Sequence, residues 1–257
     1  ELFRRGAVDR AFVYSAAFDA LQHDNVGRDE VLRPKVEKYA EPIRGLPAAL
    51  VAGGRPFELT VFSDHGMTPL TRTAEGDTVD YAVTGNFANI AAKEAKKYCS
   101  VHIAYSGEET GYVHIPAQEE LSLSEDAKYF YYCANNTIFG TAWNYVPETG
   151  NVPLMCDMSS EILSHPVDVS RFGIAYAGAQ KNMAPAGVTV VIIDRALAGH
   201  ERTITPLMLS YQRMIDKDSM YNTPPCYNIY MLGLVLDWLR EQGGVEGMER
   251  IKHAKAR

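Results

Sequence analysis

The sequence predicts an α/β fold in which a mainly parallel sheet is flanked by helices and preceded by a short α/β fragment. Two observations lead to this prediction. Beyond Asp77, strand-like and helix-like stretches alternate, which is typical of sheets with helical connections. Several short runs are almost continuously apolar, as expected of strands buried on both faces, namely 153–157, 174–179 and 188–194. Ligands bind beyond the carboxyl ends of such strands, so polar residues that follow these runs are functional candidates.

The first region of the chain supplies fewer elements. Between residues 28 and 50 the apolar positions recur at spacings of 4, 3, 4, 3 and 4, which predicts one face of an amphipathic helix, although two prolines inside it should kink or break it. Residues 57–62 form an expected strand. The polar stretch 72–76 is the natural junction, so we expect a first region over 1–76 and a second over 77–257.

The second region contains the remaining elements. Besides the three apolar runs, strands are expected over 78–84, 101–105 and 129–133, and a helix over 89–98. A longer helix is predicted over 225–241, where apolar residues recur at helical spacing and a Gly-Gly pair follows. The side chains that we expect on its core side are Tyr227, Tyr230, Met231, Leu234, Val235 and Trp238.

Composition is that of an ordinary globular protein. Of the 257 residues, 46% are hydrophobic and 22% are charged. A net charge of −7 and a pI near 5.5 argue against nucleic-acid binding, which would need a basic surface. No apolar run approaches the roughly 18–20 residues of a membrane span, and no signal-peptide pattern is visible, so no membrane association is expected. Four cysteines lack CxxC spacing and predict reduced thiols in a cytoplasmic protein: Cys99, Cys133, Cys156 and Cys226.

A lysine and an aspartate follow two of the apolar runs. Asp157 ends the run 153–157, and Lys181 comes shortly after the run 174–179. A pyridoxal-phosphate enzyme needs this pair, because its lysine forms a Schiff base with the cofactor aldehyde and its carboxylate keeps the pyridine nitrogen protonated. The alternatives are a solvated loop lysine and an aspartate that caps Ser159-Ser160. We therefore expect both side chains to face one pocket.

Three longer motifs surround these two residues and carry a resemblance. The motifs CDMSS at 156–160, RFGIAYAGAQKN at 171–182 and SMYNTPP at 219–225 together resemble the phosphoserine aminotransferase family, and the similarity extends over about 77–257. The resemblance implies the large domain of a fold-type I pyridoxal-phosphate-dependent transferase. The Gly-rich phosphate-binding turn, the His-Arg substrate pair and the small domain of that family are not visible here.

The resemblance also implies further site residues. Thr137 and Gln180 match residues that hydrogen-bond the cofactor. Phe87 stands where the family usually has a tryptophan stacked on the pyridine ring, and a phenyl ring stacks with less area. Asn222 and Thr223 match residues that reach the cofactor phosphate of the neighbouring subunit, which implies a homodimer with shared sites. As ordinary features, Thr137 would be a turn residue, and Asn222 and Thr223 part of a turn before Pro224.

The first region carries a different pattern. Asp19 and His23 are four residues apart, as on one helical face, and Asp64 and His65 follow the strand-like run 57–62. The two pairs resemble zinc ligands of the alkaline phosphatase superfamily, in its nucleotide pyrophosphatase and phosphodiesterase branch. The nucleophile and further ligands of that family are not recognisable, so residues 1–76 read as a fragment.

Three functions are compatible with the sequence. The first, implied by the longer resemblance, is pyridoxal-phosphate-dependent transfer of an amino group between glutamate and 3-phosphohydroxypyruvate, a phosphorylated keto acid, giving phosphoserine in serine biosynthesis. The second is a zinc-dependent phosphodiesterase or phosphatase built on the first region. The third is a non-catalytic chimeric chain joined near 72–77.

Overall fold

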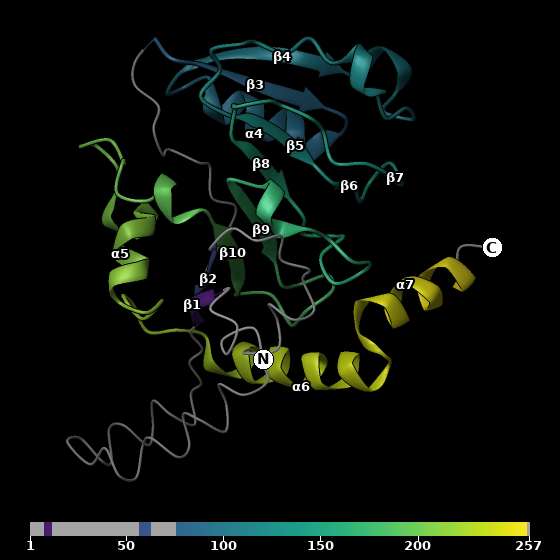
Figure 1. Cartoon of the computed structure of the whole chain (residues 1–257), viewed down its shortest axis with the longest axis vertical. Helices are drawn as coiled ribbons and strands as arrows, with labels where there is room; N and C mark the ends of the chain where they lie inside the picture. The colour runs from purple at the N-terminus through teal and green to yellow at the C-terminus, as the bar shows by residue number, and fades with distance from the viewer. Residues whose placement is uncertain (1–7, 12–56, 63–75, 256–257) are drawn as a thin grey trace.

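The computed structural model describes residues 8–11, 57–62 and 76–255, and its core is one eight-stranded sheet (Figure 1). The strand order is β1-β2-β10-β9-β8-β5-β3-β4. The strands of this sheet are β1 (Val8–Ala11), β2 (Phe57–Phe62), β3 (Thr78–Val83), β4 (Ser100–Ser106), β5 (Phe130–Cys133), β8 (Leu154–Asp157), β9 (Ile174–Gly178) and β10 (Thr189–Ile193). A separate two-stranded sheet pairs β6 (Asn135–Asn136) with β7 (Thr141–Ala142).

The sheet is mainly parallel, as the alternating pattern predicts. The pairs β3–β4, β3–β5, β5–β8, β8–β9 and β1–β2 are parallel, whereas β10 runs antiparallel to both of its neighbours, β9 and β2. β10 runs antiparallel to β9 because the connection between them, residues 179–188, contains no helix. A parallel neighbour needs a crossover of about a dozen residues or more, usually a helix, so this short segment returns the chain antiparallel.

Helices cover both faces of the sheet. They are α4 (Asn86–Ala95), α5 (Tyr211–Asp216), α6 (Cys226–Glu241) and α7 (Gly244–Lys255). Alternate strand residues enter two apolar cores, since successive side chains point to opposite faces. Tyr132, Cys156 and Ala177 share one core with residues of α6 and α7, whereas Tyr131 and Met155 share the other with residues of α4 and α5. Strands β5 and β10 are buried along their whole length, which explains their continuous apolar sequences.

The start of α4 differs from the expected helix. We expected residues 89–98, but α4 begins at Asn86, directly after Gly85. A Cβ atom at Gly85 would lie 2.4 Å from Oδ1 of Asn136, so only glycine allows this close approach. Gly85 has a φ of −177°, an extended conformation that any residue adopts, so the requirement is one of space. The early start brings Phe87 into the first turn of α4.

The predicted core side of α6 is wrong. Tyr227, Tyr230, Leu234 and Trp238 are between 44% and 63% exposed, while Met231 and Val235 are partly buried. The residues that α6 buries are Cys226, Ile229, Leu232, Gly233, Leu236 and Leu239. The helix is apolar around most of its circumference, so two stripes share the helical spacing. Periodicity alone does not choose between them, and the compact aliphatic stripe packs against the sheet.

Residues of the first region join the same sheet. Strand β2, which matches the expected strand, pairs along its length with β10. The expected helix over 28–50 and the junction over 72–75 lie outside the described residues, as do the candidate metal ligands Asp19, His23, Asp64 and His65. All four cysteines are free, and Cys133, Cys156 and Cys226 are buried. Within the described part of the chain, no helix is long and apolar enough to cross a membrane.

Candidate active site

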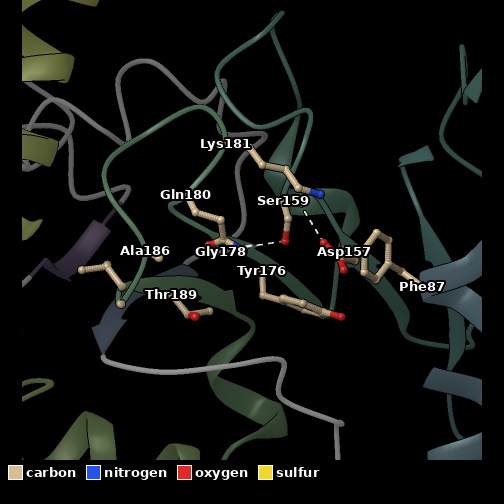
Figure 2. Close-up of a pocket in the computed structure, with 11 residues that line it drawn as sticks. Phe87, Asp157, Ser159, Tyr176, Gly178, Gln180, Lys181, Ala186 and Thr189 are labelled. Carbon is tan, nitrogen blue, oxygen red and sulfur yellow. Dashed lines mark hydrogen bonds between the residues drawn. The ribbon is translucent and has the colours of Figure 1, made fainter. Parts of the chain in front are cut away.

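A cavity of about 400 Å³ opens at the carboxyl ends of β8 and β9 (Figure 2). Asp157 and Lys181 both line it, as the sequence predicts. Strands β8 and β9 are parallel neighbours, so the residues that end or follow them meet at one edge of the sheet. The lining residues are Phe87, Asp157, Ser159, Tyr176, Gly178, Gln180, Lys181, Ala186, Gly187, Val188 and Thr189.

Asp157 is the last residue of β8 and is held by the turn that follows it. The backbone N–H of Ser159 donates to Oδ1 of Asp157 at 2.8 Å. The hydroxyl of Ser159 accepts a hydrogen bond of 3.0 Å from the backbone N–H of Gly178, at the end of β9. The aspartate therefore caps the next turn and also lines the cavity. Through Ser159 the carboxylate is fixed relative to both strand ends.

Lys181 extends across the cavity toward Asp157 and Phe87 (Figure 2). Its Nζ donates to Oγ1 of Thr137 at 2.7 Å and lies 5.1 Å from the centroid of the Phe87 ring. The side chain is exposed, so the amine is accessible from solvent. An ammonium over an aromatic face is attracted to it, and this contact together with the threonine hydroxyl orients the amine. Thr137 does not line the cavity itself and contacts the site through its hydrogen bond to Lys181.

Phe87 and Gln180 border the cavity from two sides. Phe87 comes from the first turn of α4, and its ring is 44% exposed, which leaves a face open for stacking. Gln180 lies next to the lysine and folds back toward Gly178, where an added Cβ would be 2.7 Å from its Oε1. Asn222 and Thr223 lie in the segment between α5 and α6 and do not line this cavity.

Sequence reasoning missed Tyr176, which forms part of the cavity wall. Its hydroxyl and that of Tyr131 lie 2.9 Å apart, and the Tyr131 hydroxyl lies 3.5 Å from Sγ of Cys133. Burial, reinforced by the nearby Asp157 carboxylate, raises the pKa of Tyr176 well above its usual value, so the phenol stays neutral. The strand register pairs Asp157 directly with Tyr176, and this register follows from the structure and not from the ends of the two apolar runs.

Ser159, Gly187 and Thr189 were also missed. Ser159 is the hydroxyl residue of the CDMSS motif whose backbone and side chain hold the two strand ends together. Gly187 has a φ of +116°, which favours glycine, and Thr189 is the buried first residue of β10. Only Ser159 carried a sequence signal, because it stands two residues after the strand-end aspartate.

No zinc site is visible in the part of the chain that the structure describes. Among the residues 8–11, 57–62 and 76–255, no group of three or more histidine, cysteine, aspartate or glutamate side chains could hold a metal ion.

The sheet carries its cavity at the carboxyl edge, which is where α/β proteins of this kind bind ligands. A family model described as aminotransferase class-V matches residues 66–257. The chain therefore belongs to the class-V aminotransferase family. The match begins inside the first region, ahead of the predicted junction.

Several known proteins are similar to this chain. The phosphoserine aminotransferase of Ectopseudomonas mendocina (strain ymp) is 49% identical over 187 residues, which are 73% of this chain and 52% of the relative. That of Laribacter hongkongensis (strain HLHK9) is 48% identical over 194 residues, 76% of this chain and 54% of the relative. The chain thus spans about half the length of the curated relatives it matches.

Solved structures give the same family. The phosphoserine aminotransferase of Bacillus circulans subsp. alkalophilus superposes with a TM-score of 0.79 and 39% identity, covering 85% of this chain and 62% of the other. The pyridoxal-phosphate-bound phosphoserine aminotransferase of Trichomonas vaginalis gives 0.75 and 31%, covering 84% and 62%. These comparisons give no support to the alkaline phosphatase resemblance of residues 1–76.

Proposed function

We propose that this chain is a pyridoxal-phosphate-dependent aminotransferase that transfers an amino group from glutamate to 3-phosphohydroxypyruvate, giving phosphoserine. The observation that carries the proposal is the meeting of Lys181 and Asp157, from neighbouring strand ends, at one cavity. The similarity to phosphoserine aminotransferases supports the choice of substrates.

The residues present fit the cofactor. A volume of about 400 Å³ falls within the range of ligand pockets, roughly 300–1,000 Å³. The lining offers an accessible amine for an aldehyde, a carboxylate for a protonated ring nitrogen and an exposed phenyl face for a flat heterocycle, from Lys181, Asp157 and Phe87 respectively. Thr137 and Gln180 stand beside the lysine as hydrogen-bonding groups.

When bound, pyridoxal phosphate supplies an electron sink for the bond broken at the substrate carbon. The protein's own contribution is to place protons and to hold the ring. Lys181 would hold the cofactor through its aldehyde and then move a proton between the substrate carbon and the cofactor carbon. Asp157 would keep the proton on the ring nitrogen. The backbone N–H of Ser159 holds this carboxylate by a hydrogen bond, so its position does not depend on the ligand.

The remaining residues orient these groups. Thr137 and the Phe87 ring hold the Lys181 amine over the cavity before the cofactor is present. Phe87 would then stack on the ring, with less contact area than a tryptophan. Asn222 and Thr223 would act in a second copy of the chain, completing a cofactor phosphate site across a homodimer. Their position away from the Lys181 cavity is compatible with this role.

The two-region organisation also remains a proposal. We infer that residues 1–76 and 77–257 have separate origins and meet near 72–77, although β2 of the first region pairs with β10 of the second. An intact-mass measurement combined with the reading frame of the source DNA tests this: a break in the reading frame near 72–77 supports the join, and a continuous reading frame with the expected mass counts against it.

Activity with glutamate and 3-phosphohydroxypyruvate tests the proposed function. We expect 2-oxoglutarate formation by the parent chain and loss of most of it in Asp157→Asn, because a neutral ring nitrogen is a poor electron sink. Asp194→Asn is the matched control, since Asp194 also follows a strand and accepts from the backbone N–H two residues on, at 2.9 Å. Equal activity in Asp157→Asn and Asp194→Asn would refute the assignment.

A further inference from the structure

A buried group of three side chains lies beside Asp157 on the same face of the sheet. Asp157 is paired by strand register with Cys133 of β5 and with Tyr176 of β9, and residues paired in this way point to the same face. Tyr131, two residues before Cys133, also points to that face. Tyr176 extends along the cavity wall beside Asp157 (Figure 2). We call Tyr131, Cys133 and Tyr176, which are between 1% and 7% exposed, the floor of the carboxylate.

Hydrogen bonds connect the three members of the floor. The hydroxyls of Tyr131 and Tyr176 lie 2.9 Å apart, and the Tyr131 hydroxyl lies 3.5 Å from Sγ of Cys133. A phenol has one proton to donate. Donation from Tyr176 to Tyr131, and from Tyr131 to the sulfur, gives both phenol protons an acceptor inside the floor. With this arrangement neither phenol proton is directed at Asp157.

The Asp157 carboxylate keeps one oxygen for a ligand. The backbone N–H of Ser159 donates to Oδ1, and among the described residues no other group donates a hydrogen bond to this carboxylate. Burial raises the pKa of each of the three floor residues, and the Asp157 charge raises it further, so all three stay protonated and neutral. Oδ2 is therefore the oxygen that the cavity offers to a hydrogen-bond donor.

We propose that Tyr131 is a positioning residue of the Lys181 cavity, because it holds the Tyr176 hydroxyl and so leaves Oδ2 of Asp157 to the N–H of the cofactor ring. This inference rests on the proposed pyridoxal-phosphate function. Tyr131 does not line the cavity and acts only through Tyr176, which does. Without the Tyr131 hydroxyl, the Tyr176 proton turns to the carboxylate on the neighbouring strand. A hydrogen bond to a charged acceptor is stronger than one between neutral groups, so this proton competes with the ring N–H.

The cofactor affinity of hydroxyl-deletion variants tests the proposal. The chain is titrated with pyridoxal phosphate, and the dissociation constant is taken from the visible absorbance of the bound cofactor. Tyr131→Phe keeps the buried ring and should raise this constant about fivefold or more, because the released Tyr176 proton competes for Asp157. In the double variant Tyr131→Phe/Tyr176→Phe the competing hydroxyl is gone, so affinity should return to within about twofold of the parent. A merely structural role of Tyr131 predicts no such rescue.

Tyr129→Phe is the matched control. The hydroxyls of Tyr129 and Tyr81 lie 3.0 Å apart in the same apolar core, and both residues are at most 1% exposed. Neither residue lines the Lys181 cavity. Tyr129→Phe therefore breaks an equivalent buried pair and should lower the unfolding temperature comparably to Tyr131→Phe, while cofactor affinity stays within about twofold of the parent.

Cys133→Ala provides a second route to the same result. It removes the sulfur that accepts the Tyr131 proton, so Tyr131 donates to Tyr176 and the Tyr176 proton is again released toward Asp157. Because a thiol is a weak acceptor, we expect a smaller rise in the dissociation constant of pyridoxal phosphate, about twofold or more. This variant tests the proposal even if Tyr131→Phe does not fold, which circular dichroism of each variant determines.

A measurement without cofactor separates this inference from the proposed function. Asp157→Ala should lower the unfolding temperature more in a Tyr131→Phe background than in the parent chain, because the carboxylate there accepts an additional hydrogen bond from Tyr176. In a Tyr129→Phe background the same substitution should have the parental effect.

Several results would overturn the role of Tyr131 alone. They are equal cofactor affinity of Tyr131→Phe and the parent, a double variant that binds no better than Tyr131→Phe, and equal effects of Asp157→Ala in all three backgrounds. A parent chain that binds no pyridoxal phosphate would instead overturn the proposed function and this inference together.

Discussion

A methyl group added at Gly85 should destabilise the protein through one side chain, Asn136. In Gly85→Ala the new Cβ would lie 2.4 Å from Oδ1 and 2.8 Å from Cγ of Asn136. Asn136 is only 4% exposed, and its amide group donates to Thr84 at 3.2 Å and to Thr141 at 3.0 Å. The amide must move, because the glycine backbone on the other side is fixed between β3 and α4.

The expected cost follows from these contacts. Forcing an extra methyl group into a packed interior costs roughly 1–3 kcal/mol. Displacing the Asn136 amide weakens two buried hydrogen bonds, each worth about 1 kcal/mol. We therefore expect Gly85→Ala to lower the free energy of unfolding by about 3 kcal/mol. Urea unfolding followed by far-ultraviolet circular dichroism measures this change.

A double-mutant cycle separates the clash from other effects of the substitution. In an Asn136→Ala background the two closest atoms are absent, and the nearest remaining atom of residue 136 is its Cβ, at 3.2 Å. Gly85→Ala should then cost about 1 kcal/mol, which gives an interaction energy of about 2 kcal/mol. An equal cost in both backgrounds, or a neutral Gly85→Ala, would refute the reasoning.

Three further predictions follow from other contacts. Glu161→Gln should lower the free energy of unfolding more at about pH 6 than at about pH 8. The hydrogen bond to Glu161 raises the pKa of His165 in the folded protein, so its stabilisation is fully present below the unfolded-state pKa of the histidine and is lost as pH rises through the folded-state pKa. A loss of stability in urea unfolding that does not change with pH would contradict this. Tyr131→Phe leaves the buried hydroxyl of Tyr176, on β9, without its Tyr131 partner, and should lower the free energy of unfolding by about 1–3 kcal/mol. Thermal unfolding of the variant and the parent chain measures this change. Leu236→Ala should cost about 2–5 kcal/mol and Leu234→Ala less than about 0.5 kcal/mol, and the reverse order would mean that α6 packs through its other face.

The sequence predicted the sheet because strands that are buried on both faces consist almost entirely of apolar residues. The runs 153–157, 174–179 and 188–194 became β8, β9 and β10, each shorter by one or two residues. Helix α6 was also predicted from the sequence, but the face that it buries was not. Tyr230 and Trp238 recur at the same helical spacing as the aliphatic residues that α6 buries, so the choice of face depends on packing against the sheet, which a single helical period does not encode.

The candidate site was predictable where a charged side chain ends or follows an apolar, strand-like run. Asp157 and Lys181 met at one cavity because parallel neighbouring strands place their carboxyl ends together. Tyr176 was missed because it lies inside an apolar run, where a core residue is expected. Its place in the cavity wall depends on the register between β8 and β9. Thr137 was found only by resemblance, since a threonine in a turn has no sequence signal of its own.

Covalent trapping of pyridoxal phosphate tests the central claim most directly. The chain is incubated with the cofactor and reduced with borohydride, and the modified peptide is identified by mass spectrometry. Lys181→Ala removes an exposed side chain, so the fold should survive, and the exposed Lys217→Ala serves as the control. We predict that the label falls on Lys181, disappears in Lys181→Ala and persists in Lys217→Ala. Label spread evenly over the surface lysines, or retained at the parent level in Lys181→Ala, would contradict the assignment of this cavity as the cofactor site.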